Sequence, residues 1–89
     1  MNQATWDEQR DGARIAKQRD DIWNAIRDGN WYTLSQLEQT TGHPQSSISA
    51  RLRDFRKARY GSHQIQRGYV DRGLWQYRLA DNVQIEMAL

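Results

Sequence analysis

The stretch that most constrains this chain is TLSQLEQTTGHPQSSISARLRDFRK, residues 33–57, which predicts two short helices joined by a tight turn. Thr33 is a good N-cap, and Gln36, three residues further on, completes a capping box. The first helix is therefore predicted from Leu34 to Thr41. Gly42 ends it, because glycine adopts the left-handed backbone conformation at little cost.

A second helix is predicted from about Pro44 to Ala58, because proline has a preset φ and no amide hydrogen, which suits a first helical position. Ile48, Leu52 and Phe55 follow at spacings of four and three residues, so they form one buried stripe. Two helices with a glycine-containing turn between them are typical of a helix-turn-helix, whose second helix enters the DNA major groove.

The length of 89 residues indicates one small domain, and the lack of cysteine excludes a disulfide framework and a thiolate metal site. No apolar run approaches 18 residues and no signal peptide is visible, so we expect a cytosolic protein with no membrane partner. Small domains are often stabilised by oligomerisation. A homodimer through the first helix, the N-terminal arm or the C-terminal tail is therefore one expectation.

The positive charge is concentrated in one part of the chain. The whole chain carries a net charge of +2, whereas residues 51–78 hold eight basic and two acidic side chains. Eleven of the thirteen basic residues are arginine. The planar guanidinium group suits phosphates and guanine edges better than the ammonium group of lysine does. A nucleic acid is therefore the expected partner of this part of the chain.

The segments before residue 33 are less regular. Residues 1–12 are interpreted as a frayed or weakly helical arm, since Gly12 costs a helix about 1 kcal/mol relative to alanine. A helix is predicted from Ala13 to Asp28, with Gly29 and Asn30 as a stop signal. Trp31 and Tyr32 are expected to form a short extended link.

A β-hairpin is predicted after the second helix. Residues 63–66 form its first strand, and Leu74 to Leu79 form the second, where Trp75, Tyr77 and Leu79 alternate with polar residues. The connecting loop is predicted over about residues 67–73, with glycine near both ends of its tip. The final residues, 81–89, are interpreted as a tail that forms an extra strand, a dimer contact or a loose end.

The apolar positions of all these segments predict a single core. Its predicted members are Ile22, Trp23, Ile26, Leu34, Leu37, Ile48, Leu52, Phe55, Ile65, Trp75, Tyr77 and Leu79.

A helix, a helix-turn-helix and then a hairpin with an arginine-bearing loop resemble the winged helix-turn-helix family of small bacterial and phage-encoded DNA-binding proteins. The resemblance covers roughly residues 13–79 and is carried by the 33–57 stretch and by GLWQYRL as the closing wing strand. Two residues depart from the family pattern. His43 stands where a large aliphatic residue is usual, and Ala50 stands where arginine is frequent.

The resemblance implies an α+β, mostly helical fold with a three-helix core and a two-stranded β-hairpin wing, over residues 13–80. It also implies double-stranded DNA as the partner, with the second helix in the major groove and the wing on the backbone or in the minor groove. The implied role is transcriptional regulation or a phage DNA transaction, near the nucleoid in the cytoplasm of a bacterial cell or phage-infected host.

The candidate DNA contacts fall into three groups by chemistry. Glutamine and serine can bond base edges, alanine can touch a thymine methyl group, and arginine can reach guanine or phosphate. The base-reading candidates are Gln45, Ser46, Ser49, Ala50 and Arg53, and Ser47 beside them is a further candidate DNA contact. The phosphate candidates at the end of the second helix are Arg51, Arg56, Lys57 and Arg59. The wing candidates are Arg67 and Arg72.

Each group also has a purely structural interpretation. Glutamine and serine are ordinary on a solvated helix face, and cations near a helix C-terminus favour the helix dipole. Charged residues at a hairpin tip also prevent edge-to-edge strand pairing. The context of a helix-turn-helix followed by a basic hairpin favours DNA contact.

Two other functions remain as alternatives. A winged helix can serve as a protein-interaction module, because fold does not determine function. The aromatic residues could bind single-stranded nucleic acid, but most of them fall at core positions. His43 and His63 are the only histidines and have no cysteine cluster beside them, so no metal site is expected. No pairing of nucleophile and base stands out either, so we expect neither an enzyme nor a cofactor.

Overall fold

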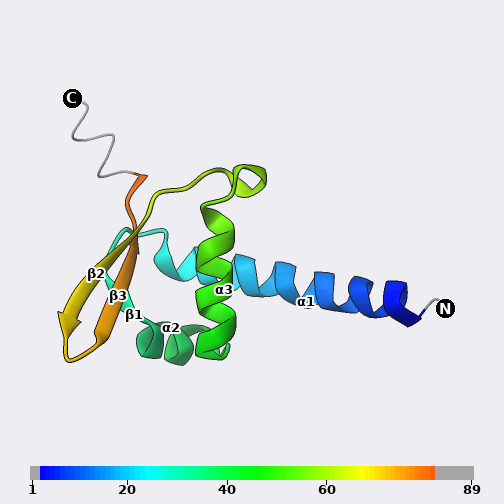
Figure 1. The fold of residues 1–89 in the computed structure, drawn as a ribbon, viewed down its shortest axis with the longest axis horizontal. Coiled ribbons are helices and arrows are strands. Elements are labelled where there is room, and N and C mark those ends of the chain that lie inside the picture. Colours follow the sequence, from blue (N-terminus) through cyan, green and yellow to red (C-terminus); the bar gives the residue numbers. More distant parts are fainter. Residues whose placement is uncertain (1–2, 82–89) are drawn as a thin grey trace.

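The computed structural model describes residues 3–81, with side chains from residue 12 onward. Within that range the chain forms three α-helices and a three-stranded antiparallel sheet, which confirms the predicted α+β class (Figure 1). The elements are α1 (Gln3–Ile26), β1 (Tyr32–Thr33), α2 (Leu34–Thr41), α3 (Gln45–Phe55), a 3-10 helix η1 (Ala58–Tyr60), β2 (Ile65–Asp71) and β3 (Leu74–Leu79).

Helix α1 is longer than predicted. It begins at Gln3 and passes through Gly12, whereas the sequence predicted a start at Ala13. One glycine costs about 1 kcal/mol, too little to stop a helix whose neighbouring residues favour it. The N-terminal half of α1 projects beyond the rest of the fold (Figure 1). The other end stops at Ile26, and Gly29 follows in the left-handed conformation with a φ of 81°.

Helix α2 has the predicted bounds and the predicted caps. The Thr33 side chain accepts a hydrogen bond from the Gln36 amide at 3.1 Å, and the Gln36 side chain accepts one from the Thr33 amide at 2.9 Å. Gly42 ends the helix in the left-handed conformation, and its amide donates to the Glu38 carbonyl. Both ends of α2 are therefore determined by local hydrogen bonds.

Helix α3 is shorter than the predicted range of residues 44–58. Pro44 is its N-cap, in extended conformation, and not its first helical residue. The helix ends at Phe55 because Lys57 is extended, and the chain then turns through η1. That turn brings the His63 amide to the Phe55 carbonyl at 2.8 Å. The last predicted turn of α3 is thus replaced by a tight reversal toward β2.

The hairpin is also tighter than predicted. The predicted loop over residues 67–73 is a two-residue turn, Arg72–Gly73, in which both residues have positive φ, as a type I′ turn requires. Strand β2 therefore runs to Asp71 and holds Arg67 in its middle, with a bulge between Tyr69 and Asp71. Strand β3 has its predicted bounds.

Strand β1 was missed by the sequence analysis, which predicted only an extended link. Tyr32 pairs with Tyr77 and Thr33 pairs with Gln76, so the sheet has the order β1-β3-β2. A two-residue strand has no periodicity to detect. It is recognisable only from its partner β3.

The core lies where the three helices meet the sheet. Its buried residues are Ile22, Ile26, Leu37, Ile48, Leu52, Phe55, Ile65 and Leu79, with Trp23, Leu34 and Tyr77 packed partly buried against them. All of these were predicted. Trp75 was predicted there too, but this assignment is wrong, because it lines an open groove with Leu34 and Gln45 and is 37% exposed.

The end of the described chain is held in place by Asp81. Its carboxylate contacts His63 Nδ1 at 2.8 Å and accepts from the Gln64 amide at 2.7 Å. The predictions for residues 82–89 lie outside the described residues. In the part of the chain that is described, no helix is long and apolar enough to cross a membrane.

We predict that Thr33→Ala lowers the free energy of unfolding by about 1 kcal/mol, because the Gln36 amide loses its acceptor at the start of α2. Urea unfolding measures the effect. Thr40→Ala, at an exposed position inside α2, is the matched control and leaves the stability equal or slightly higher. Equal losses in the two variants would show that the capping box contributes nothing.

Candidate nucleic-acid interface

The outer face of α3 is polar and carries one charge. The stripe of Ile48, Leu52 and Phe55 is buried, which turns the opposite face outward. On that face Gln45, Ser46 and Arg53 are exposed, and Ser49 and Ala50 are partly exposed. Three residues, 42–44, separate α2 from α3. The predicted base-reading residues are therefore brought together, with Ser47 at the margin.

The N-terminal half of α3 lies between two hollows. A cleft of about 590 Å³ separates it from α1, where Ile15 and Gln18 face Pro44, Ser47 and Ala50. On the other side, a groove of about 320 Å³ is lined by Gln45 and the hairpin residues Leu74 and Trp75, with Leu34 from α2. Figure 1 shows α3 between the projecting half of α1 and the hairpin. Any partner of α3 would therefore also lie close to both.

Gln45 is held at the start of α3 by a residue that the sequence analysis did not single out. Its amide nitrogen donates to the Glu38 carboxylate of α2 at 3.0 Å. The two residues are seven apart and lie on different helices, so helical spacing cannot reveal the contact. The position of the α2–α3 turn is what brings them together.

Arg51 has a structural role in the fold. Its Nε lies 2.9 Å from the Asp54 carboxylate, and its Nη1 donates to Gln18 of α1 at 3.3 Å. The Arg51 and Asp54 side chains are only 13% and 12% exposed. The Nε hydrogen is not aligned for a hydrogen bond, so the contact with Asp54 is coulombic. The guanidinium group of Arg51 is therefore largely buried and already engaged within the fold.

Arg56 also makes an internal contact. Its Nε and Nη2 donate to the Ile65 carbonyl at 3.3 and 2.8 Å, which ties the end of α3 to the start of β2. Lys57 is 56% exposed and lies 3.3 Å from Asp54, and Arg59 stacks on Tyr60 with its guanidinium 5.0 Å from the ring centre. Of these three, Lys57 and Arg59 present their charge more freely to solvent.

The outer part of the hairpin is braced by aromatic contacts. The Arg67 guanidinium lies 4.3 Å from the Trp75 ring centre, and Tyr69 meets Trp75 edge to face at 5.2 Å. The Tyr69 hydroxyl accepts a hydrogen bond from the Gly73 amide, so this ring packs under the turn. Arg72 stands at the turn itself, 92% exposed and 3.9 Å from Asp71.

The opposite face of the sheet carries a second arginine–aromatic stack. Arg78 lies 4.6 Å from the Trp31 ring centre and donates to Gln66 across the hairpin. Trp31 reaches over Gly68, where an added Cβ would meet its ring at 3.2 Å. The sequence analysis assigned none of these residues to a site. The alternation of side chains along β3 places Arg78 and Tyr77 on opposite faces of the sheet. This alternation was the sequence signal that could have placed Arg78 on the outer face.

The turn between α2 and α3 is tied to α1 through His43. Its Nε2 lies 2.8 Å from the Asp21 carboxylate, which also pairs with Lys17 at 3.1 Å. The hydrogen bonds from His43 and then from Lys17 hold the pKa of Asp21 below its ordinary value of 3.8. His43 therefore links the turn after α2 to α1 through a polar contact.

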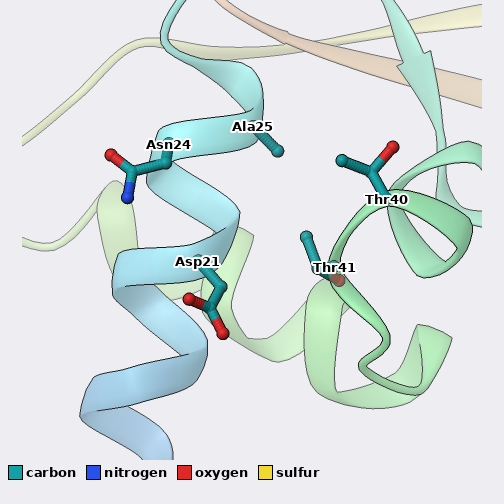
Figure 2. Close-up of a pocket in the computed structure, with 5 residues that line it drawn as sticks. All are labelled: Asp21, Asn24, Ala25, Thr40 and Thr41. Atoms are coloured by element: carbon teal, nitrogen blue, oxygen red, sulfur yellow. The ribbon is translucent and has the colours of Figure 1, made fainter.

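A polar pocket of about 350 Å³ lies between α1 and α2 beside this contact. Figure 2 shows Ala25 pointing toward Thr40 and Thr41, whereas Asn24 points away from α2. Asp21 is already bonded to His43 and Lys17, and the Thr41 hydroxyl donates to the Leu37 carbonyl. Asp21 and Thr41 are thus already bonded, within their own helices and, for Asp21, to the turn after α2.

Within the described residues, no group of three or more acidic, histidine or cysteine side chains is placed to hold a metal ion. Comparison of the chain with protein-family models, with curated proteins and with solved structures finds no match.

We predict that Arg51→Ala lowers the free energy of unfolding by about 2–4 kcal/mol, because it leaves the buried Asp54 carboxylate without its nearest partner. Arg53→Ala, on the exposed face of the same helix, changes it by less than about 0.5 kcal/mol. Thermal or urea unfolding distinguishes the two variants. Similar losses would contradict the structural role of Arg51.

A second prediction concerns pH. Because the pKa of Asp21 is lower in the folded chain than its ordinary value, the ionised carboxylate stabilises the fold above about pH 3.8. This contribution is lost as the pH falls through the lower folded-state pKa. Wild type should therefore be more stable than Asp21→Asn near neutral pH, and the two urea midpoints should converge at low pH.

The matched control for this pH experiment is Asp20→Asn, at the exposed neighbouring position on α1. Its difference from wild type should be smaller near neutral pH. A gap between wild type and Asp21→Asn that stays constant down to about pH 2 would mean that the His43 contact does not depend on the charge of Asp21.

Proposed function

We propose that this protein is a small winged helix-turn-helix protein that binds double-stranded DNA. The observation that carries the proposal is the outer face of α3. This helix follows α2 after a three-residue turn, buries its apolar stripe, and presents glutamine, serine and arginine to solvent next to a hairpin with a cation at its tip. A helix presented in this way fits the major groove of B-DNA.

In this proposal the first turns of α3 read base edges. Gln45 and Ser46 are exposed at its N-terminus, the part of a recognition helix that contacts bases in helix-turn-helix proteins. Ala50 suits a thymine methyl group, and Arg53, one turn further on, reaches guanine or a phosphate. Ser47 and Ser49, which are less exposed, lie at the margins of this contact.

The phosphate contacts are proposed for the cations whose charged groups face solvent. These are Arg53, Lys57, Arg59 and Arg72. Arg51 and Arg56 are instead assigned a structural role, since their guanidinium groups bond to Gln18 and to the Ile65 carbonyl, although Arg56 is itself exposed. Phosphate contacts fix the position of a protein on the duplex but do not select its sequence.

The β2–β3 hairpin acts as the wing. Arg72 at its turn lies on the backbone or enters the minor groove, where a narrow A·T-rich groove attracts arginine. Arg67 is stacked on Trp75, so its role is to make the wing rigid more than to reach the DNA. Because one helix reads only a few base pairs, a homodimer would double the site. Such a protein suits transcriptional regulation or a phage DNA transaction.

A second candidate function is protein interaction through the hairpin. Tyr69, Val70, Leu74 and Trp75 are large apolar residues of the hairpin that are 37–58% exposed. Exposed apolar surface rimmed by polar residues often marks a protein contact. This function does not require α3 to contact DNA, so the two candidates make different predictions.

We predict that the chain binds a random-sequence duplex with strongly salt-dependent affinity. About four phosphate contacts give a slope near −3.6 for log affinity against log salt. The double variant Arg53→Gln/Arg72→Gln should reduce the magnitude of that slope by about 1.8, because each lost contact contributes about 0.9. Fluorescence anisotropy at several salt concentrations measures both values, with a single strand of the same sequence for comparison.

The control is Arg27→Gln, which removes one positive charge, compared with two in the double variant, from an exposed turn outside α3 and the hairpin. It should keep the wild-type slope. No duplex binding by wild type at low salt would refute the proposal and favour the hairpin as a protein contact. An equal change of slope per removed charge in the two variants would indicate non-specific attraction to the whole chain.

A further inference from the structure

The contact between Gln45 and Glu38 joins a candidate base-reading residue to a carboxylate of the preceding helix. A carboxylate oxygen can only accept hydrogen bonds, so the side of the Gln45 amide that faces Glu38 must be its NH₂ group. The contact therefore sets which way the amide is turned. Without it, the amide could present either its oxygen or its nitrogen to a partner.

The orientation set by Glu38 leaves one donor and one acceptor of the Gln45 amide free to bond a base. The amide nitrogen carries two hydrogens, and Glu38 accepts one of them. The amide oxygen and the hydrogen on its own side form the outer edge of the planar group, so a bond to Glu38 through the other hydrogen leaves this edge free. That pair of one donor and one acceptor matches adenine, whose N7 accepts and whose N6 amino group donates in the major groove.

Guanine presents a different pattern. Its N7 and O6 both accept, so an amide held with its oxygen toward the groove would face an acceptor with an acceptor. A free glutamine can rotate to avoid this clash, but one tied to Glu38 cannot. The hydrogen bond to Glu38 therefore disfavours guanine as well as favouring adenine. Discrimination between two partners often needs such a repulsive element.

We infer that Glu38 is a positioning residue that makes Gln45 specific for adenine. The inference rests on the proposed function, since it assumes that α3 lies in the major groove. Glu38 itself touches no base. Its negative charge near phosphates weakens binding overall, so this residue exchanges affinity for specificity. A merely structural residue would not have these two opposite effects.

The experiment begins with a selection of randomised duplexes on the full chain. The preferred duplex is then made with each of the four base pairs at every position, and anisotropy gives the affinities. Wild type should prefer A·T over G·C at one position by about tenfold or more, the order expected of a bidentate base contact. Gln45→Ala should abolish that preference.

Two variants of Glu38 separate orientation from charge. Glu38→Ala should lose the adenine preference while binding the guanine duplex roughly two- to fivefold more tightly at low salt, because a negative charge is removed. Glu38→Gln should keep only part of the preference, since its amide can either accept from Gln45 or donate to it, and should also bind more tightly than wild type. Gln39→Ala, at the exposed neighbouring position on α2, should match wild type.

Because of the position of Glu38, a loss of folding in its variants should not be the explanation for a change in DNA binding. Its side chain is exposed, and its backbone carbonyl, which accepts from the Gly42 amide, is retained in every variant. The melting temperature of Glu38→Ala should therefore stay within a few degrees of wild type.

Three results would overturn the inference. In one, Glu38→Ala keeps the wild-type preference for adenine. In another, the selected site shows no position that depends on Gln45, which leaves DNA binding intact but removes the role of this contact. In the third, wild type binds no duplex at all, in which case the proposed function fails with it.

Discussion

The packing of one stripe on α3 against α1 and α2 determines the geometry of the whole surface. Ile48, Leu52 and Phe55 lie in the same buried cluster as Ile22 and Leu37. Burying a large aliphatic side chain contributes roughly 1.5–3 kcal/mol, so rotating α3 about its axis would be strongly unfavourable. The direction in which the polar face points is thus a consequence of core packing.

Features encoded by neighbouring residues were predictable from the sequence. The capping box, the glycine at the end of α2 and the spacing of the stripe all depend on residues within a few positions of one another, and the structure reproduces them. Strand β3 was predictable for the same reason. These local signals were sufficient to place α2, the turn after it and the second strand of the hairpin, whereas the first strand begins at Ile65 and not at residue 63 as predicted.

Features that depend on a distant partner were not predictable in this way. Alternation placed Trp75 in the core, but an open groove lies between it and the helices, so it stays 37% exposed. Charge placed Arg51 and Arg56 among the phosphate contacts, whereas their partners, Gln18 and the Ile65 carbonyl, come from other elements. The sequence shows how many cations a region has, but only the fold shows which of them are already engaged.

The pairing of β1 with β3 has a consequence for how this molecule moves. Thr33 is at once the N-cap of α2 and a strand residue opposite Gln76. Separating the hairpin from the helices would therefore also disturb the first turn of α2. Because only three residues join α2 to α3, the packing of α3 would be disturbed as well. The hairpin and the α2–α3 pair should therefore open together as one cooperative unit in hydrogen exchange. A force applied at the hairpin tip would be transmitted to the outer face of α3.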